Sequence, residues 1–367
     1  MVTRVLGLNS CTIIAEQAAD CNNDLTSRGP VCYNDAMNAS AHLPPTPVPV
    51  DACGRSVNYL RCSVTTACNL SCFYCAGNDR TSASQASLDT AGLLIIFRAA
   101  ARLGFTKLRL TGGEPLLRND LADIVRAARD LGSFTDISLT TNAHLLPTCG
   151  EELRDAGLQR VNINLDSLDA ATYRRITGGD LAAALAGIET ACRLFSNVRL
   201  NMVVLRDVND LECPAFVAFG RERGIAVRFL EMVPATASFH RHFIPNDTVR
   251  AALASQFLLD HASGHDTSCT ATWYRVNGGP QEIGFISPVS NMFCASCNRL
   301  RVTTAGELVP CLHSHIRVPL ADILKFPNAE LEVMARILGA AAMKEPAHHI
   351  SAGQFSAPLK DMLHVGG

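Results

Sequence analysis

The sequence lacks both a large excess of one charge and long apolar runs. Its 32 lysines and arginines nearly balance 34 aspartates and glutamates, which leaves a formal net charge of −2 at pH 7. A chain so close to neutrality gives no electrostatic reason to expect a nucleic acid or a membrane surface as partner. No apolar stretch approaches the roughly 18 residues that a membrane-spanning helix needs. We therefore expect no nucleic-acid partner and no membrane partner.

The chain also lacks the N-terminal pattern of a secretory signal peptide, although it contains 15 cysteines. In a secreted protein such a number would predict disulfides. Here several cysteines are grouped at the short spacings that are typical of metal ligands. These features predict a protein of the reducing cytoplasm.

Residues 1–55 have no sustained hydrophobic period and include a proline-rich run at 42–49 that is typical of an extended linker. The cysteines in this stretch are irregularly spaced, which favours a loosely ordered N-terminal extension over a metal site. We expect a barrel domain at 56–235 and a C-terminal region at 236–367.

Strand patterns alternate with amphipathic helical patterns from residue 58 onward. Six strands are expected near residues 59–65, 107–111, 135–141, 160–166, 198–205 and 226–231. Helices are expected between them, for example at 88–103, 119–131 and 180–195. Repeated β-then-α units predict a parallel sheet with right-handed crossovers.

Every predicted strand has a polar face opposite an apolar one; the first carries Arg61, Ser63 and Thr65 on its polar face. Strands of a doubly wound sheet, which are buried on both faces, would be almost continuously apolar. The pattern therefore favours an α/β fold with a partial (β/α)6 TIM-like barrel, a polar interior that holds a ligand, and a C-terminal appendage.

The predicted interior is rich in cations. The strands contribute Arg61, Lys107, Arg109, Arg199 and Arg228. Each buried ion carries a desolvation penalty of several kcal/mol unless it is paired. Asp166, Glu114 and Glu231 could neutralise some of this charge. As a set, the cations predict a polyanionic ligand, because arginine forks onto phosphate oxygens.

Cys68, Cys72 and Cys75 follow the first predicted strand. Three thiolates at this spacing can bind three irons of a [4Fe–4S] cube and leave the fourth iron open to a small molecule. The intervening Phe73 and Tyr74 would shield such a cluster from water. A zinc loop or three unrelated thiols is the alternative, which the longer spacing behind a strand disfavours. The loop resembles the signature of radical S-adenosylmethionine (SAM) enzymes, which implies reductive cleavage of SAM to a 5′-deoxyadenosyl radical.

A second motif, Thr111-Gly112-Gly113-Glu114-Pro115, follows the second predicted strand. Gly-Gly alone also fits a plain tight turn. In this position it resembles the motif with which radical SAM enzymes bind the amino group of SAM. The resemblance implies a SAM-binding set of Tyr74, Gly112, Gly113, Glu114, Thr141, Asn164 and Val233.

A second cysteine group consists of Cys294, Cys297 and Cys311. Together with His313 these residues could form a tetrahedral zinc site. Alternatively, the three cysteines hold a second cluster with an open iron. Arg299 and Arg301, which stand at alternate positions beside the loop, favour the cluster.

The segments 293–301 and 306–312, together with the C-terminal Gly366-Gly367, are similar to the GTP 3′,8-cyclase family, and the similarity covers residues 58–367. The resemblance implies a lyase that uses two [4Fe–4S] clusters and SAM to convert GTP into (8S)-3′,8-cyclo-7,8-dihydroguanosine 5′-triphosphate for molybdenum cofactor biosynthesis. It also implies an electron donor, and a homodimer is a further possibility.

The resemblance assigns roles to individual residues. The cluster ligands would be Cys68, Cys72, Cys75, Cys294, Cys297 and Cys311. The catalytic residues would be Arg61, Arg299, Arg301, Gly366 and Gly367. The GTP-binding residues would be Arg61, Lys107, Arg109, Arg199, Arg228, Arg299 and Arg301.

Ala143, Asn164, Arg199 and Val233 depart from the family pattern, and Ala76-Gly77 replaces the apolar–Pro continuation after the first cysteine loop. They motivate an alternative, a diverged radical SAM paralogue that acts on another nucleotide, a metabolite or a peptide. A third, non-enzymatic hypothesis makes the second cysteine group a zinc-bound interaction module.

Overall fold

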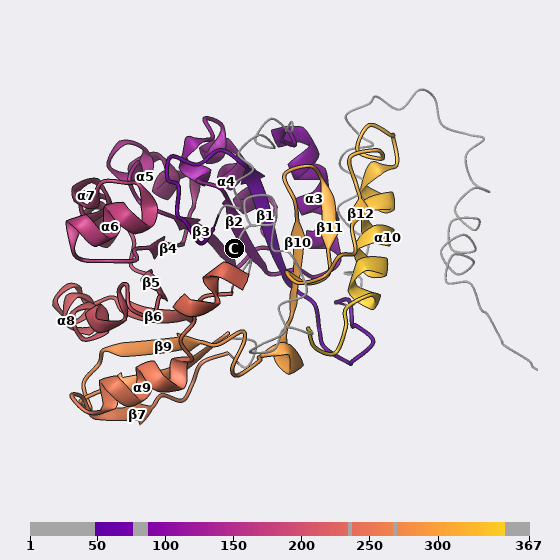
Figure 1. Ribbon diagram of the computed structural model, residues 1–367. Coiled ribbons are helices and arrows are strands. Elements are labelled where there is room, and N and C mark those ends of the chain that lie inside the picture. Colours follow the sequence, from indigo (N-terminus) through magenta and orange to yellow (C-terminus); the bar gives the residue numbers. More distant parts are fainter. Residues whose placement is uncertain (1–47, 76–86, 234–236, 267–269, 349–367) are drawn as a thin grey trace, which may run out of the picture. The chain divides into compact units, whose positions relative to one another are not determined.

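The computed structural model describes residues 48–75, 87–233, 237–266 and 270–348 (Figure 1). Most of the predicted N-terminal extension lies outside the described residues, and so do Gly366 and Gly367.

A twelve-stranded sheet of order β12-β11-β10-β1-β2-β3-β4-β5-β6-β9-β8-β7 forms the centre of the described structure. Strands β1 to β6 pair in parallel and in chain order. They are β1 Tyr59–Thr65, β2 Lys107–Gly112, β3 Asp136–Thr141, β4 Arg160–Asn164, β5 Val198–Val204 and β6 Ala226–Glu231. Because β12 and β7 are edges and do not pair with each other, the sheet is open. The predicted α/β fold with a partial barrel is confirmed.

Helices connect these strands on the outer side of the curved sheet (Figure 1). They are α3 Thr90–Arg102, α4 Leu121–Asp130, α5 Leu146–Ala156, α6 Ala170–Thr177, α7 Leu181–Leu194 and α8 Cys213–Arg223. The predicted bounds of the six strands and of three of these helices agree with the structure to within two residues. No helix in the described part of the chain has the length and apolar character needed to cross a membrane.

The alternation of apolar and polar residues along each strand separates the hydrophobic core beneath the helices from the polar inside of the barrel. In β1, Leu60, Cys62 and Val64 are buried in the main apolar cluster beneath the helices. Arg61, between them, lines the central cavity. Burying the apolar faces drives the packing of helices on the sheet, so the polar faces are left to form the inside of the barrel.

Local signals determine where several helices begin and end. The side chain of Asp89 accepts a hydrogen bond from Gly92 N at 2.8 Å at the start of α3, and Asp169 accepts one from Thr172 N at 2.8 Å at the start of α6. Such N-caps satisfy amide groups that have no partner inside the helix. Helix α6 ends at Gly178, whose φ of +72° favours glycine.

The C-terminal residues extend the same sheet at both edges. Strand β10 (Arg299–Val302) pairs in parallel with β1, and β9 (Glu282–Ile286) pairs in parallel with β6. The other elements are α9 Asn246–Ala254, β7 Leu259–His261, β8 Ala271–Val276, β11 Glu307–Val309, β12 Val318–Pro319 and α10 Ala329–Ala342. Helix α10 lies beside α3 (Figure 1). The second cysteine group therefore lies in loops next to β10 and β11, which belong to the barrel sheet.

Gly187 in α7 allows this helix to pack against the end of β3. A Cβ atom at residue 187 would lie 2.0 Å from the carbonyl oxygen of Ala143. We expect Gly187→Ala to destabilise the protein by about 1–3 kcal/mol because backbone has to move. Gly339 in α10 has no atom within 4 Å of such a Cβ. Gly339→Ala should stabilise the helix by about 0.5–1 kcal/mol. Denaturant unfolding of both variants measures the difference, and equal effects would contradict this packing.

Candidate active site

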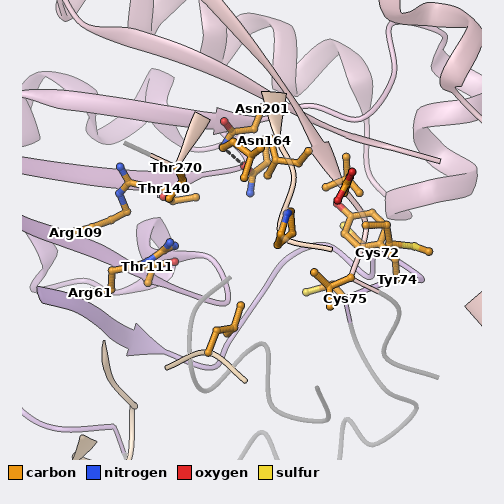
Figure 2. Close-up of a pocket in the computed structure, with 18 of the residues that line it drawn as sticks. Arg61, Cys72, Tyr74, Cys75, Arg109, Thr111, Thr140, Asn164, Asn201 and Thr270 are labelled. Atoms are coloured by element: carbon orange, nitrogen blue, oxygen red, sulfur yellow. Dashed lines mark hydrogen bonds between the residues drawn. The ribbon is translucent and has the colours of Figure 1, made fainter. Parts of the chain in front are cut away.

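A cavity of about 310 Å³ lies inside the partial barrel, a size typical of ligand sites. It is lined by residues of all six barrel strands or the loops that follow them, and by residues of the C-terminal region. All six predicted cluster ligands line it: Cys68, Cys72, Cys75, Cys294, Cys297 and Cys311. Figure 2 shows Arg61 and Arg109 on one side of this cavity and Cys72, Tyr74 and Cys75 on the other. The structure thus brings together two cysteine groups that lie far apart in the sequence.

The two groups lie at opposite ends of β1. The first follows the C-terminal end of β1, whereas Cys297 precedes β10, whose first residue, Arg299, pairs with Tyr59 at the N-terminal end of β1. From its first to its last residue, the seven-residue strand β1 spans six steps of about 3.3 Å each, a length of about 20 Å. The cavity therefore has one cysteine group at each end.

The first cysteine loop is held by the end of α6. Ser71 N donates to Thr177 O at 2.7 Å, and Phe73 N donates to Ile176 O at 3.0 Å. The loop approaches the helix end so closely that a Cβ atom at Gly178 would lie 2.5 Å from Ser71 Oγ. The backbone of the loop is therefore positioned before any ligand binds.

The glycines of the second motif also position this loop. Gly113 N donates to Thr65 O at 2.8 Å. Cβ atoms at Gly112 and Gly113 would lie only 2.3 Å from Thr65 O and 2.2 Å from Ala67 O. The sequence led us to expect a close approach of backbone to a ligand. In the structure, the close approach is to the backbone at the start of the cysteine loop, and both glycines also line the cavity.

Glu114 is buried and hydrogen-bonded within the protein. Its carboxylate accepts hydrogen bonds from Leu116 N at 3.0 Å, Thr141 Oγ1 at 2.7 Å and Asn142 N at 2.7 Å. Burial raises the pKa of Glu114 to about 7, although these hydrogen bonds lower it in part. Glu114 and Thr141 thus join the ends of β2 and β3 beside the cavity.

Tyr74 covers the inner side of the first cysteine loop. Its hydroxyl donates to Asp166 Oδ2 at 2.5 Å, and Asp166 Oδ1 accepts from Val203 N at 3.0 Å. Burial raises the pKa of Asp166 to about 6. Phe73 packs edge-on against Tyr74 with ring centroids 5.9 Å apart. The two rings join an apolar cluster around Ile176, beside which Cys72 and Cys75 are partly buried while Cys68 is exposed.

Strand register creates a row of arginines. Arg61 pairs with Arg301 of β10 on one side and with Arg109 of β2 on the other. Burial lowers the pKa of Arg61, and the positive charges of Arg301 and Arg109 lower it further. Burial also lowers the pKa of Arg301, and the positive charge of Arg299 lowers it further, to about 10. Like charges packed this closely favour an anionic ligand between them.

Amide side chains orient Arg228 at the other side of the interior. Arg228 Nε donates to Asn201 Oδ1 at 2.8 Å, and Nη2 donates to Asn162 Oδ1 at 2.7 Å. Asn201 Nδ2 in turn donates to Asn164 Oδ1 at 2.8 Å (Figure 2). Arg228 is only 4% exposed. The sequence indicated polar positions on β4 and β5, but it gave no signal for this network.

Lys107 and Arg199 do not line the cavity. Lys107 forms an ion pair with Asp266, and the Arg199 guanidinium lies 5.5 Å from the ring centroid of Trp273. Val233, another predicted site residue, does line the cavity. The ligand-binding roles assigned to these three residues stay predictions.

The second cysteine loop is surrounded by positive charge. Arg299 Nη2 donates to Cys297 Sγ at 3.3 Å, and Lys344 Nζ lies 3.7 Å from the same sulfur. Burial raises the pKa of Cys297, but Arg299 and Lys344 more than offset this and lower it to about 6. Cys297 is thus prepared to be a thiolate, the form that binds metal.

His313, the fourth ligand of the zinc alternative, lies in the same part of the cavity. Its ring centroid is 4.4 Å from that of His348, and burial lowers its pKa to about 3, with a further lowering by His348. Among the described residues, no group of three or more His, Cys, Asp or Glu side chains is arranged to hold a single metal ion.

Two residues at the second loop were missed by sequence analysis. Arg55, in the segment expected to be loose, donates to Cys294 O at 2.7 Å. Lys344 lies just beyond α10, where a lysine usually indicates a solvated helix end. The only signal for order at Arg55 in the sequence was an aspartate, Asp51, four residues before it. In the structure, Arg55 Nε lies 2.6 Å from Asp51 Oδ2.

Comparison with known proteins identifies the chain's relatives. Residues 62–219 match the Radical SAM superfamily, and residues 225–350 match the family described as Molybdenum Cofactor Synthesis C. The GTP 3′,8-cyclase of Clostridium acetobutylicum is 34% identical over 321 residues, covering 87% of this chain and 100% of that protein. That of Marinobacter nauticus is 38% identical over 325 residues, covering 86% and 98%.

A similar fold occurs in a solved structure, Streptococcus suis SuiB bound to S-adenosylmethionine. The TM-score is 0.55 at 14% identity, covering 88% of this chain and 76% of SuiB, so this likeness concerns the fold alone. The identity to the cyclases over nearly their whole length is decisive for the family. The chain belongs to the GTP 3′,8-cyclase family of radical SAM proteins.

Proposed function

We propose that this protein is a GTP 3′,8-cyclase, a lyase that uses SAM to convert GTP into (8S)-3′,8-cyclo-7,8-dihydroguanosine 5′-triphosphate in molybdenum cofactor biosynthesis. The observation that carries the proposal is one cavity lined by both cysteine groups and by five arginines. Those arginines are Arg61, Arg109, Arg228, Arg299 and Arg301. Family membership supplies the reaction.

The first cysteine loop fits an iron–sulfur cluster. Cys68, Cys72 and Cys75 are free thiols on one loop at the cavity. Burial raises the pKa of Cys75 to about 11, and binding to iron would stabilise its thiolate instead. A [4Fe–4S] cluster held by these residues would supply the electron that cleaves SAM. Tyr74, whose ring joins the apolar cluster around Ile176 and whose hydroxyl donates to Asp166, would limit the access of water to the iron–sulfur cluster.

SAM would lie at the same end of the cavity as the first cysteine loop. Gly112 and Gly113 hold the start of that loop, while Thr141, Asn164 and Val233 line the cavity beside it. Asn164 is oriented by the hydrogen bond from Asn201. We assign these residues to SAM together with Glu114, whose buried carboxylate already accepts three hydrogen bonds within the protein.

GTP would occupy the remaining length of the cavity. Arg61, Arg228 and Arg301 are each at most 8% exposed, so phosphate oxygens would compensate charges that water does not reach. We assign Lys107 and Arg199 to GTP binding as well. The present partner of Lys107 is the carboxylate of Asp266, so phosphate would replace one anion by another.

Cys294, Cys297 and Cys311 would hold a second [4Fe–4S] cluster whose open iron binds the guanine base. Arg299 and Lys344 next to Cys297 offset the negative charge that three thiolates bring. The proposal also includes an external low-potential electron donor. Homodimer formation and the roles of Gly366 and Gly367 stay predictions.

The reaction itself is the first test. Anaerobically reconstituted protein with dithionite, SAM and GTP should form 5′-deoxyadenosine and the cyclised nucleotide in step, as measured by liquid chromatography and mass spectrometry. A Cys72→Ala variant should form neither product, because the first cluster would lack a ligand. Formation of 5′-deoxyadenosine with GTP unchanged would refute the proposal and support a paralogue with another substrate.

Metal content tests the second cysteine group. Two [4Fe–4S] clusters predict about eight iron and about eight sulfide per chain. Replacing Cys294, Cys297 and Cys311 by alanine should reduce both to about four, while 5′-deoxyadenosine is still formed slowly without cyclisation. About four iron together with one zinc per wild-type chain would favour the zinc module instead.

Arg228 tests the position of GTP. Arg228→Ala should weaken GTP binding by about 1.5–3 kcal/mol, the contribution of hydrogen bonds to a charged group, and leave SAM binding unchanged. Arg126→Ala serves as the control, since Arg126 lies on the outside of α4 in an exposed ion pair with Asp123 and should affect neither ligand. Equilibrium binding of GTP and of SAM is measured for both variants. Equal loss of GTP and SAM binding by Arg228→Ala would mean that the interior is misassigned.

A further inference from the structure

Lys344 is buried beside the second cysteine loop, although it follows a surface helix. Its residue is only 4% exposed. The Nζ atom donates to Arg299 O at 2.8 Å and to Pro310 O at 3.0 Å, and it lies 3.7 Å from Cys297 Sγ. An ammonium group has three N–H donors, and Arg299 O, Pro310 O and Cys297 Sγ give each of them an acceptor. Lys344 therefore links the segment that carries Cys297 to the segment that carries Cys311.

The position is unfavourable for a lysine unless negative charge is near. A buried ammonium carries a desolvation penalty of several kcal/mol. The carbonyl groups of Arg299 and Pro310 satisfy its hydrogen bonds but have no net charge. The sulfur of Cys297 becomes a thiolate when it binds iron, and Cys311 follows Pro310 directly. The charge of Lys344 is thus compensated best when the loop holds a metal cluster.

Other contacts keep the segment after α10 in place. Arg55 donates to Glu345 O at 2.7 Å, to Pro346 O at 3.1 Å and to Cys294 O at 2.7 Å. The backbone next to Lys344 is therefore tied to the first cysteine of the group. This arrangement gives the ammonium a defined distance from the Cys297 sulfur, whereas a flexible surface lysine would have none.

We propose that Lys344 is a positioning residue of the second cysteine group, which fixes the loop and, through the Cys297 sulfur, eases reduction of the cluster bound there. The inference rests on the proposed function, in which these cysteines hold a [4Fe–4S] cluster. One-electron reduction by an external low-potential donor adds one negative charge to the cluster. A cation held close to a ligand sulfur in a poorly solvated site stabilises that added charge and so raises the reduction potential.

The test isolates the second cluster. In the full-length chain, Cys68, Cys72 and Cys75 are replaced by alanine, so that only the second cysteine group can hold a cluster. Lys344→Gln keeps a hydrogen-bond donor but removes the charge, whereas Lys344→Arg keeps the charge. Lys325→Gln is the control for loss of one lysine charge, because Lys325 is exposed and lies before the start of α10, whereas Lys344 follows its end. Redox titration with dithionite, followed by electron paramagnetic resonance, measures the midpoint potential of the cluster. Only chains that contain a cluster give a signal, so incomplete incorporation of iron does not mask a shift in potential.

We expect Lys344→Gln to shift the midpoint potential to more negative values, while Lys344→Arg and Lys325→Gln leave it near that of the parent. Equal potentials for Lys344→Gln, Lys344→Arg and the parent, at about four iron per chain, would overturn the role of Lys344 and leave the proposed function standing. Absence of an iron–sulfur centre from the parent itself would contradict both the second cluster and this inference.

Discussion

The parallel pairing of β10 with β1 is the constraint on which the site depends. It sets Arg301 beside Arg61 and Arg299 beside Tyr59. Because β1 leads into the first cysteine loop and β10 follows the second, the same pairing puts the two groups at opposite ends of a strand about 20 Å long. A shift by one residue would turn Arg299 and Arg301 away from the cavity. Register, more than any single contact, therefore defines the distance between the two cysteine groups.

Charge balance follows from this geometry. The arginine row is buried, and close packing of like charges lowers the pKa of Arg61 and of Arg301. Burial raises the pKa of Cys72, Cys75 and Cys294, whereas Arg299 and Lys344 lower the pKa of Cys297; all cysteines that bind metal do so as thiolates. Loading the cavity with clusters and a triphosphate would thus neutralise charges that the protein alone keeps at a cost. Of the arginines that line the cavity, Arg228 is held by amide acceptors within the protein, Asn162 and Asn201.

The sequence predicted what short-range patterns encode. The six barrel strands were located because their polar and apolar faces alternate, and the first cysteine loop because its ligands lie within eight residues. Pairing between β10 and β1 was beyond such patterns, since nothing local specifies which distant strand a short segment joins. Lys344 and Arg55 were missed for the same reason: each acts on the second cysteine loop from a segment remote in sequence. Gly112 and Gly113 were recognised as sites of close approach, but the identity of the approaching group, the loop backbone, required the fold.

The departures from the family pattern are not equal in consequence. Ala143 has a φ of +69°, a conformation that costs about 1–2 kcal/mol in a non-glycine residue, and burial of its methyl group returns about 0.8 kcal/mol. Neither Ala143 nor Arg199 lines the cavity, whereas Asn164 and Val233 do. Asn164 is the last residue of β4 and Val233 follows β6, and the hydrogen bond from Asn201 holds Asn164 in one orientation. Of these four departures, Asn164 and Val233 are therefore the ones that change the lining of the cavity, and none of the four alters the arginine row or the second cysteine group.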